Sequence, residues 1–428
     1  MNDSSQIDKT INHLFRQESG RMVSVLLKIF GSNNLELAED VVQDALISAL
    51  ETWKIKGVPD NPKAWLYRAA KNKAIDILRK EKFSESIDFE DPERQLLKSE
   101  YTLANTMEQL WDDDSIKDDF LAMMFACCHP EISEENQITF ILKSLCGFST
   151  KEVASSFLTS EDTISKRLYR TKEFFRKSGT RPKIPSSNEI VPRTKAVLNS
   201  IYLMFNEGYN STHADELVRE DLITQALLLC RSLTEHEKTN LPEVYALMAL
   251  MCFHASRSKS RVSEEGEMVL LADQNRNLWN QELITLGNQY LNQSAFGKSM
   301  SMFHLEAAIA SAHCAAQKFE DTDWKLILNC YDQMLAVSED PVVRINRSIA
   351  VAEISGAKTA LESLKQLEKD SRIQKYYMYH SVVGEFNERL NQHQLARNHY
   401  ELAKRLTQSE REKSFLDGKL KKLSHLTN

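Results

Sequence analysis

Residues 149–177 read STKEVASSFLTSEDTISKRLYRTKEFFRK, a segment that specifies two helices and the turn between them. Ser149 precedes Glu152 by three residues, which is the spacing of a capping box that satisfies unpaired amides at a helix start. We therefore expect the first helix to begin near Thr150. The second should begin at Glu161, because acidic residues suit the first turn of a helix.

The apolar residues of this segment predict which side of each helix is buried. The first helix would pack through Val153, Ala154, Phe157 and Leu158. On a wheel of about 100° per residue, the second would pack through Ile164, Leu168, Thr171 and Phe175. Its other side carries Thr163, Lys166, Arg170 and Lys177, with Arg167 beside them. Such a basic side can enter a DNA major groove, although a solvated surface helix is the alternative.

A second basic segment, residues 63–82, holds seven Lys or Arg against two Asp or Glu. Pro62 suits the first position of a helix, where its missing N–H would be unpaired anyway. The apolar face contains Leu66, Ala69, Ala70, Ala74, Ile77 and Leu78, and the polar face contains Arg68, Lys71, Asn72, Arg79 and Lys82. Trp65 lies among the charges, as suits contact with unstacked bases; the alternative for Trp65 is a core anchor.

The acidic residues gather between the two basic segments. Residues 84–119 contain 12 Asp or Glu and three Lys or Arg. This composition is typical of a solvated connector and repels DNA.

The order and spacing of these motifs resemble those of a known family. Residues 39–45 (EDVVQDA), 57–66 (GVPDNPKAWL) and 75–79 (IDILR) resemble region 2 of bacterial extracytoplasmic-function sigma factors, and residues 148–177 resemble region 4. The resemblance implies an all-α protein. It would have a region 2 helical bundle over 1–83, the acidic linker over 84–119, and a helix-turn-helix region 4 over 120–181.

The resemblance also implies a role for each motif. Asp40, Gln43 and Asp44 would bind core RNA polymerase. Lys63, Trp65, Arg68, Lys71, Asn72 and Arg79 would read the −10 element of promoter DNA and help to melt it. Thr163, Lys166, Arg167, Arg170 and Lys177 would read the −35 element. The alternative is a helix-turn-helix regulator with a repeat sensor domain that never joins polymerase.

Beyond the prolines and serines of residues 181–187, the chain exceeds what a minimal sigma factor needs. Helical periodicity continues through 187–290, and residues 291–428 approach the 34-residue spacing of tetratricopeptide (TPR) repeats. The last repeat is the clearest, with Gly384, Ala396, Tyr400 and Ala403 at the small and aromatic positions. The two segments together resemble the C-terminal extension of one subgroup of these sigma factors, which implies self-regulation and a docking surface for a protein or small-molecule regulator.

A polar set interrupts the apolar helices of residues 187–290. It comprises Asn206, Glu207, Gly208, Tyr209, Arg257, Asp273, Gln274, Arg276 and Trp279. Interhelical salt bridges and helix caps explain such a set, and a small-molecule or partner pocket is the alternative.

Composition limits the classes of function. Gly and Pro number 12 and 9 in 428 residues, which favours long helices with short turns, and the net charge of −7 leaves DNA affinity to local patches. The seven cysteines lack secretory spacing, and Cys127-Cys128-His129 has no second ligand pair, so we expect reduced thiols, no metal and a cytoplasmic protein. Catalytic motifs, a signal peptide and an apolar span are missing, so we expect no enzyme activity, no cofactor and no membrane partner.

Overall fold

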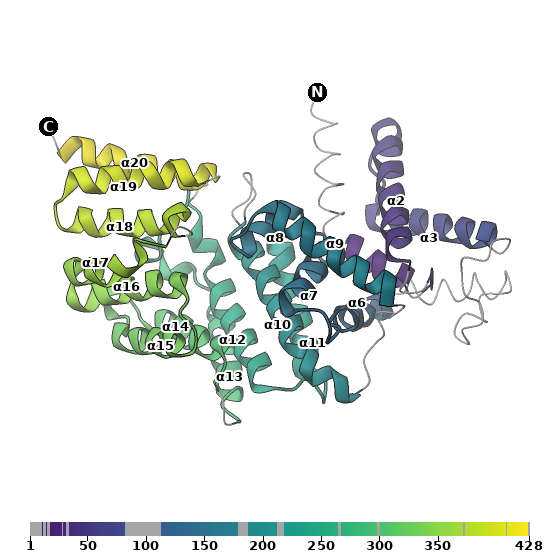
Figure 1. The fold of residues 1–428 in the computed structure, drawn as a ribbon, viewed down its shortest axis with the longest axis horizontal. Helices are drawn as coiled ribbons and strands as arrows, with labels where there is room; N and C mark the ends of the chain where they lie inside the picture. The colour runs from purple at the N-terminus through teal and green to yellow at the C-terminus, as the bar shows by residue number, and fades with distance from the viewer. Residues whose placement is uncertain are drawn as a thin grey trace. The chain divides into compact units, whose positions relative to one another are not determined.

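The computed structural model describes residues 11, 14, 18–27, 29–30, 34–81, 113–178, 187–211, 218–263, 267–297, 300–370, 373–407 and 409–426. The chain divides into two compact units, Met1–Met204 and Phe205–Asn428. Within the ranges just given, the secondary structure is helical apart from one isolated bridge between Val262 and Met268 (Figure 1). The all-α prediction is therefore confirmed.

The first unit begins with helical residues 18–27, followed by α2 (Leu35–Lys56) and α3 (Pro62–Glu81). Gly57 ends α2 at a φ of +79°, a left-handed conformation that glycine adopts without a Cβ clash. Pro62 then opens α3, as the sequence predicts. Trp53, at the C-terminal end of α2, is fully buried, and the edge of the Trp65 ring meets it. This contact fixes α3 against α2.

The second part of the first unit is a group of shorter helices. It contains α6 (Asp113–Cys127), α7 (Glu134–Phe140), the π-helix η2 (Ile141–Leu145), α8 (Thr150–Ser156), α9 (Glu161–Ser178) and the start of α10 (Ser187–Tyr209). Of the expected acidic linker, residues 84–112 lie outside the described residues. Residues 113–119 form the beginning of α6.

The second unit continues from the end of α10 as a series of helices. The first helices are α11 (Glu220–Glu235), α12 (Pro242–Ser256), α13 (Gln281–Gln293) and α14 (Met302–Ala315). Between α12 and α13 run three 3₁₀ turns, η3 (Ser258–Arg261), η4 (Leu271–Asp273) and η5 (Arg276–Leu278). The remaining elements are η6 (Phe319–Asp321), α15 (Trp324–Val337), α16 (Pro341–Ser355), α17 (Ala357–Leu364), η7 (Lys365–Leu367), η8 (Ile373–Lys375), α18 (Tyr377–Arg389), α19 (His393–Leu406) and α20 (Glu410–Leu426).

Helices α18 and α19 approach each other closely at Gly384. A Cβ atom at Gly384 would lie 2.7 Å from Cδ1 of Tyr400, so only glycine fits opposite this ring. Ala396, Tyr400 and Ala403 of α19 are fully buried. The close packing expected from these small and aromatic positions is confirmed.

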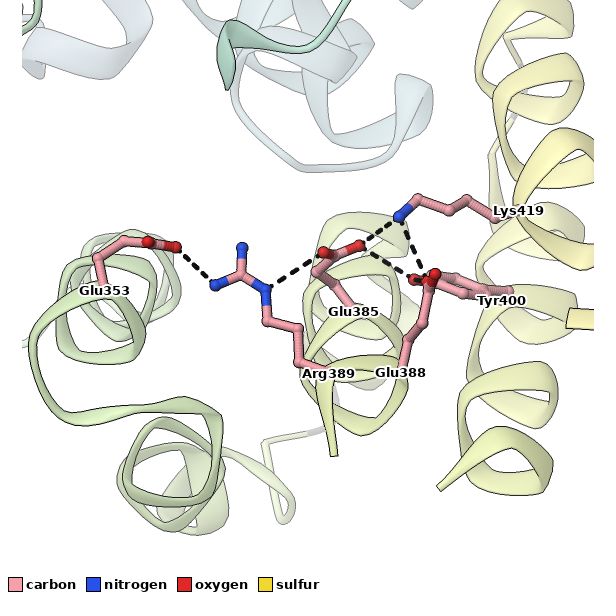
Figure 2. A network of polar contacts seen from close by, with 6 residues as sticks. All are labelled: Glu353, Glu385, Glu388, Arg389, Tyr400 and Lys419. Carbon is pink, nitrogen blue, oxygen red and sulfur yellow. Dashed lines mark hydrogen bonds and ion pairs between the residues drawn. The ribbon is translucent and has the colours of Figure 1, made fainter. Parts of the chain in front are cut away.

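A charged network joins α16, α18, α19 and α20 around the hydroxyl of Tyr400 (Figure 2). That hydroxyl donates to Glu388 at 2.6 Å, and Lys419 of α20 lies 2.6 Å from Glu385. Arg389 reaches from α18 to Glu353 of α16 at 2.6 Å. Burial raises the pKa of Tyr400, and its bonds to carboxylates raise it further, so the phenol stays protonated and acts as a donor.

Candidate nucleic-acid interface

Helix α8 starts as the sequence predicts. The Ser149 hydroxyl accepts from the Glu152 amide at 3.1 Å, and the Glu152 carboxylate accepts from the Ser149 amide at 2.6 Å. Val153 and Ala154 are buried, but the expectation that Leu158 packs beside them is wrong. Leu158 sits in the turn before α9 at a φ of +48° and is 62 % exposed, because the chain has already left the helical register there.

Helix α9 has one buried side and one exposed basic side. Ile164, Thr171 and Phe175 are buried, as the wheel predicts. Lys166 and Lys177 are exposed, and each pairs with an acid on its own helix, Asp162 at 2.7 Å and Glu173 at 2.6 Å. Because of its bond to Glu173, Lys177 has a raised pKa. The side chain of Thr163 is half-buried, and its hydroxyl lies 2.9 Å from that of Ser160.

Two arginines of α9 lie in different environments. Arg170 is exposed and has no ion pair or hydrogen bond from its side chain to the described residues. Arg167 is only 18 % exposed, pairs with Glu135 of α7, and lies 5.0 Å from the centre of the Phe157 ring. Of the two, only Arg170 can turn its guanidinium towards a ligand without breaking a contact.

The polar side of α3 is open along part of its length. Arg68 and Asn72 are exposed, Lys71 is half-buried, and Trp65 is half-buried against Trp53. The packing of Trp65 agrees with a core anchor that still presents part of its surface. Helix α3 includes Arg79, whose side chain lies outside the described residues.

The start of α3 is tied to the preceding helical segment. Lys63 lies 3.7 Å from Glu18 and 5.5 Å from the centre of the Tyr67 ring. The Tyr67 hydroxyl donates to the same carboxylate of Glu18. Lys63 is thus held at the base of α3, and it is less available than Arg68.

One side of α2 carries a stripe of four residues, here called the α2 stripe: Asp40, Gln43, Asp44 and Ile47. Asp40 and Gln43 are exposed, and Asp44 pairs with Lys73 of α3 at 2.7 Å, which raises the pKa of that lysine. Ile47 lies one turn further along the same side and is 52 % exposed. Sequence reasoning missed Ile47, although its distance of three residues from Asp44 and four from Gln43 is the signal that places it there.

Two further exposed residues of α9 were not predicted. Tyr169 is 67 % exposed next to Arg170, and Arg176 is exposed beside Lys177. On the helical wheel, Tyr169 and Arg176 fall between the buried side and the basic side, so neither was assigned to the basic side. Together they widen the surface that α9 presents.

Contacts within the first unit also join its two helical groups. Lys172 of α9 lies 2.8 Å from Glu39 of α2. A Cβ atom at Gly20 would overlap the carbonyl oxygen of Leu145 in η2, so this glycine permits a close backbone approach. Beside these contacts lies a cavity of 340 Å³, with Leu27, Leu35, Phe140 and Tyr169 in its lining. The exposed side of α2 and helix α9 are thus parts of one packed unit.

The cysteine cluster is a packed part of the core. Cys127 and Cys128 are buried, and burial raises the pKa of both thiols, that of Cys128 to about 12. The Cys128 thiol donates to the Met124 carbonyl at 3.3 Å. In the portion of the chain that is described, His, Cys, Asp and Glu side chains form no group of three suited to a metal ion. None of the helices described there combines the length and the apolar character needed to cross a membrane.

Comparison with known proteins agrees with this architecture. Residues 14–84 match the family described as Sigma-70 region 2, and residues 193–295 match a family of unknown function, DUF6596. An uncharacterised protein of Rhizobium meliloti is 32 % identical over 384 residues, which cover 90 % of this chain and 88 % of that protein. A probable RNA polymerase sigma factor of Haemophilus influenzae is 25 % identical over 149 residues, 33 % of this chain and 75 % of that protein. No solved structure matches the chain.

The region 2 match and the similarity to a probable sigma factor define a sigma-70 class of protein. The chain belongs to this class as an ECF-like member with a C-terminal extension that contains the DUF6596 domain.

Proposed function

We propose that the protein is a cytoplasmic, non-enzymatic sigma factor that binds core RNA polymerase and directs initiation at specific promoters. The observation that carries this proposal is the region 2 match over residues 14–84, within which α3 keeps Arg68 and Asn72 exposed beside a half-buried tryptophan. A cation, an amide and an aromatic edge on one helix suit a strand whose bases have left the duplex.

Helix α3 would bind the −10 element. Arg68 can neutralise phosphates of the displaced strand, and Asn72, one turn further on, can donate to and accept from a base edge. The contact of the half-buried Trp65 with the buried Trp53 would hold the helix rigid while the DNA opens. The polar side of α3 would therefore bind the DNA, and its apolar side would hold the helix in position.

Helices α8 and α9 would act as a helix-turn-helix on the −35 element. The capping box and the turn at Leu158 set the angle of α9, whose exposed Lys166 and Arg170 would face the major groove. The ion pair of Arg167 with Glu135 would instead hold α9 on α7. Base reading would therefore rest mainly on Arg170, since an arginine fork can bind a guanine edge in two places.

The stripe on α2 would bind core polymerase. Asp40 and Gln43 supply polar contacts, and Ile47 supplies an exposed apolar side chain at the centre of such a contact. An aliphatic residue surrounded by polar ones is the usual arrangement of a protein interface. The stripe faces away from the apolar side of α2, so that polymerase can bind without unpacking the helix.

Binding to a promoter would require the two helical groups of the first unit to separate. The −10 and −35 elements are about 25 base pairs apart, which is roughly 85 Å along B-DNA at 3.4 Å per pair. A compact unit with the chain length of Met1–Met204 has a radius of gyration of only about 17 Å. The half-exposed pair of Glu39 and Lys172 is weak enough to break when polymerase binds.

The extension would regulate this activity. Its last helices resemble TPR repeats, which stack into concave surfaces that hold peptides. The ion pair of Lys419 with Glu385 joins α20 to α18, and that of Arg389 with Glu353 joins α18 to α16; both would keep such a surface rigid (Figure 2).

Competition for core polymerase tests the proposal. Purified core enzyme is mixed with the full chain and with a labelled sigma factor of the same host, and the label on core is measured. A polymerase subunit displaces the labelled sigma in proportion to its concentration. A DNA-binding regulator that does not join polymerase leaves the label in place, and that result would reject the proposal.

A further inference from the structure

Two arginines of the second unit lie against one tryptophan ring, and a third lies against a tyrosine ring. The guanidinium carbon of Arg276 lies 4.6 Å from the centre of the Trp279 ring, and that of Arg257 lies 5.7 Å from it. Arg261, one turn after Arg257, lies 3.7 Å from the centre of the Tyr209 ring. The three arginines and Trp279 all fall within residues 193–295, the part that matches DUF6596.

The backbone holds this arginine cluster, Arg257, Arg261 and Arg276, in place. The Asn280 amide, which follows Trp279, donates to the Ser256 carbonyl at 2.9 Å and so joins the end of η5 to the end of α12. Nη1 of Arg276 donates to the carbonyls of His313 and Ala316 at 2.6 and 2.7 Å, at the end of α14. Three separate elements therefore converge on the cluster.

The positive charges of the cluster lack carboxylate partners. Among the described residues, no Asp or Glu lies within ion-pair distance of any of the three arginines. Arg261 donates to the Tyr209 carbonyl and to Asn210, and Arg257 lies 2.8 Å from Nδ1 of His254. Glu320 and Asp321 act on Arg276 only from beyond that distance.

The cluster also contains buried donors without an acceptor. Nε of Arg257, Nη2 of Arg276 and Nε1 of Trp279 have no hydrogen-bond partner. Arg257 is 7 % exposed and Trp279 is 4 % exposed, so water does not cover these residues freely. A buried donor without a partner is unfavourable, and more so when it is charged, so three such donors on Trp279 and the two arginines against its ring call for an acceptor.

The neighbouring histidines carry no charge that would balance the arginines. Burial, followed by the charges of Arg257 and Arg276, lowers the pKa of His313 to about 3. Burial, followed by Arg257 and Arg261, holds the pKa of His254 well below its usual range. Both imidazoles are therefore neutral near pH 7, and neither supplies a negative charge to the arginines.

We propose that Arg257, Arg276 and Trp279 form a binding site for a small oxyanion, carried as the phosphate or carboxylate group of a metabolite. An oxyanion has only acceptor atoms and negative charge, which match the three unpaired donors and the two arginines at once. The burial of Arg257 and Trp279 selects a small ligand, because the phosphates of a duplex would need these groups on the open surface.

Binding of simple anions to the full-length protein tests this site. The protein is titrated in Tris chloride at constant ionic strength with inorganic phosphate in one arm and succinate in the other, and heat of binding and thermal unfolding are measured. At least one anion should bind with a Kd of about 1 mM or tighter. It should raise the unfolding midpoint, since a ligand of the native state stabilises it.

Substitutions locate the binding. Arg257→Gln and Arg276→Gln should each weaken it about tenfold or more, the loss expected for one charged hydrogen bond. Trp279→Phe keeps an aromatic ring and removes the Nε1 donor with the five-membered ring of the indole, so it should weaken binding; the thermal unfolding of the variant shows whether it remains folded. Arg347→Gln is the control, because Arg347 forms a surface pair with Asp332 on other helices.

The two arms separate the ligand classes. A response to phosphate alone assigns a phosphorylated ligand, and a response to succinate alone assigns a carboxylate. Failure of both anions to bind overturns the proposal. Binding that Arg257→Gln, Arg276→Gln and Trp279→Phe leave unchanged overturns it too, because the anion would then lie elsewhere.

Discussion

Arg167 of α9 pairs with Glu135 of α7 and covers the ring of Phe157, its guanidinium carbon 5.0 Å from the ring centre. Three residues further along the same helix, Arg170 makes no such contact with the described residues. Two arginines on one basic helix therefore have separate tasks, one in holding the helix and one in binding.

This division predicts opposite phenotypes for the two alanine variants. Arg167→Ala should weaken the packing of α9 by about 1 kcal/mol, the sum expected of a partly exposed ion pair and a cation–π contact. Hydrogen exchange of the α9 amides in the full chain should therefore speed up. Arg170→Ala should leave exchange unchanged and lower affinity for the −35 element by about 1–3 kcal/mol, measured on holoenzyme.

The control for this pair is Arg405→Ala, because Arg405 is an exposed arginine on α19 in the other unit. It should alter neither quantity. Equal promoter affinity in Arg170→Ala and wild type would reject the assignment of α9 as the reading helix.

The exposed pair on α3 predicts a defect in promoter melting. Arg68→Ala combined with Asn72→Ala should lower permanganate reactivity of −10 thymines on duplex promoter about tenfold or more, because one phosphate and one base contact are lost. On a template that is already unpaired at −10, the defect should be smaller. A double variant that melts duplex promoter as well as wild type does would remove α3 from the account.

The apolar residue on the α2 stripe predicts a polymerase contact. Ile47→Ala should reduce affinity for core enzyme by about 1 kcal/mol or more. The variant lacks the apolar surface that the isoleucine side chain would bury on binding. The unfolding free energy should stay within about 0.5 kcal/mol of wild type, because the side chain is exposed.

Leu395→Ala is the matched control, since Leu395 is 50 % exposed on α19 against 52 % for Ile47. It should bind core enzyme normally. If both variants lose affinity equally, the loss does not come from the α2 stripe.

The contact of Gly384 with Tyr400 predicts a stability effect in the extension. Gly384→Ala would place a Cβ 2.7 Å from the Tyr400 ring, and overpacking of this kind costs about 1–3 kcal/mol. Gly418→Ala in α20 meets nothing within 4 Å and should stabilise by about 0.5–1 kcal/mol, because alanine favours a helix. Urea unfolding of the two variants checks both signs; destabilisation by Gly418→Ala, or none by Gly384→Ala, contradicts the packing.

Local rules made part of this fold predictable from sequence. The capping box at Ser149, the proline that opens α3 and the buried face of α9 each depend on residues a few positions apart. Leu158 was misjudged because a left-handed turn residue looks like one more apolar position of the helix. The π-helix η2 has no signal in the apolar and polar pattern of the sequence.

Long-range contacts could not be predicted in the same way. Glu135 precedes Arg167 by 32 residues, and Glu39 precedes Lys172 by 133, so no helical periodicity connects them. The sequence marks the polar set around Trp279 as unusual, but it does not decide between interhelical salt bridges and a binding pocket. Only coordinates show that Arg257 and Arg276 share one ring without a carboxylate partner among the described residues.

Transcription in vitro tests the central claim most directly. Purified core polymerase is incubated with genomic DNA of the host, with and without the full chain, and the 5′ ends of all transcripts are sequenced. We predict new start sites that depend on the chain, share two boxes at a constant spacing, and decline with Arg170→Ala and with the Arg68 and Asn72 double variant. Identical start sites with and without the chain, under conditions in which another sigma factor is active, would contradict its role as a sigma factor.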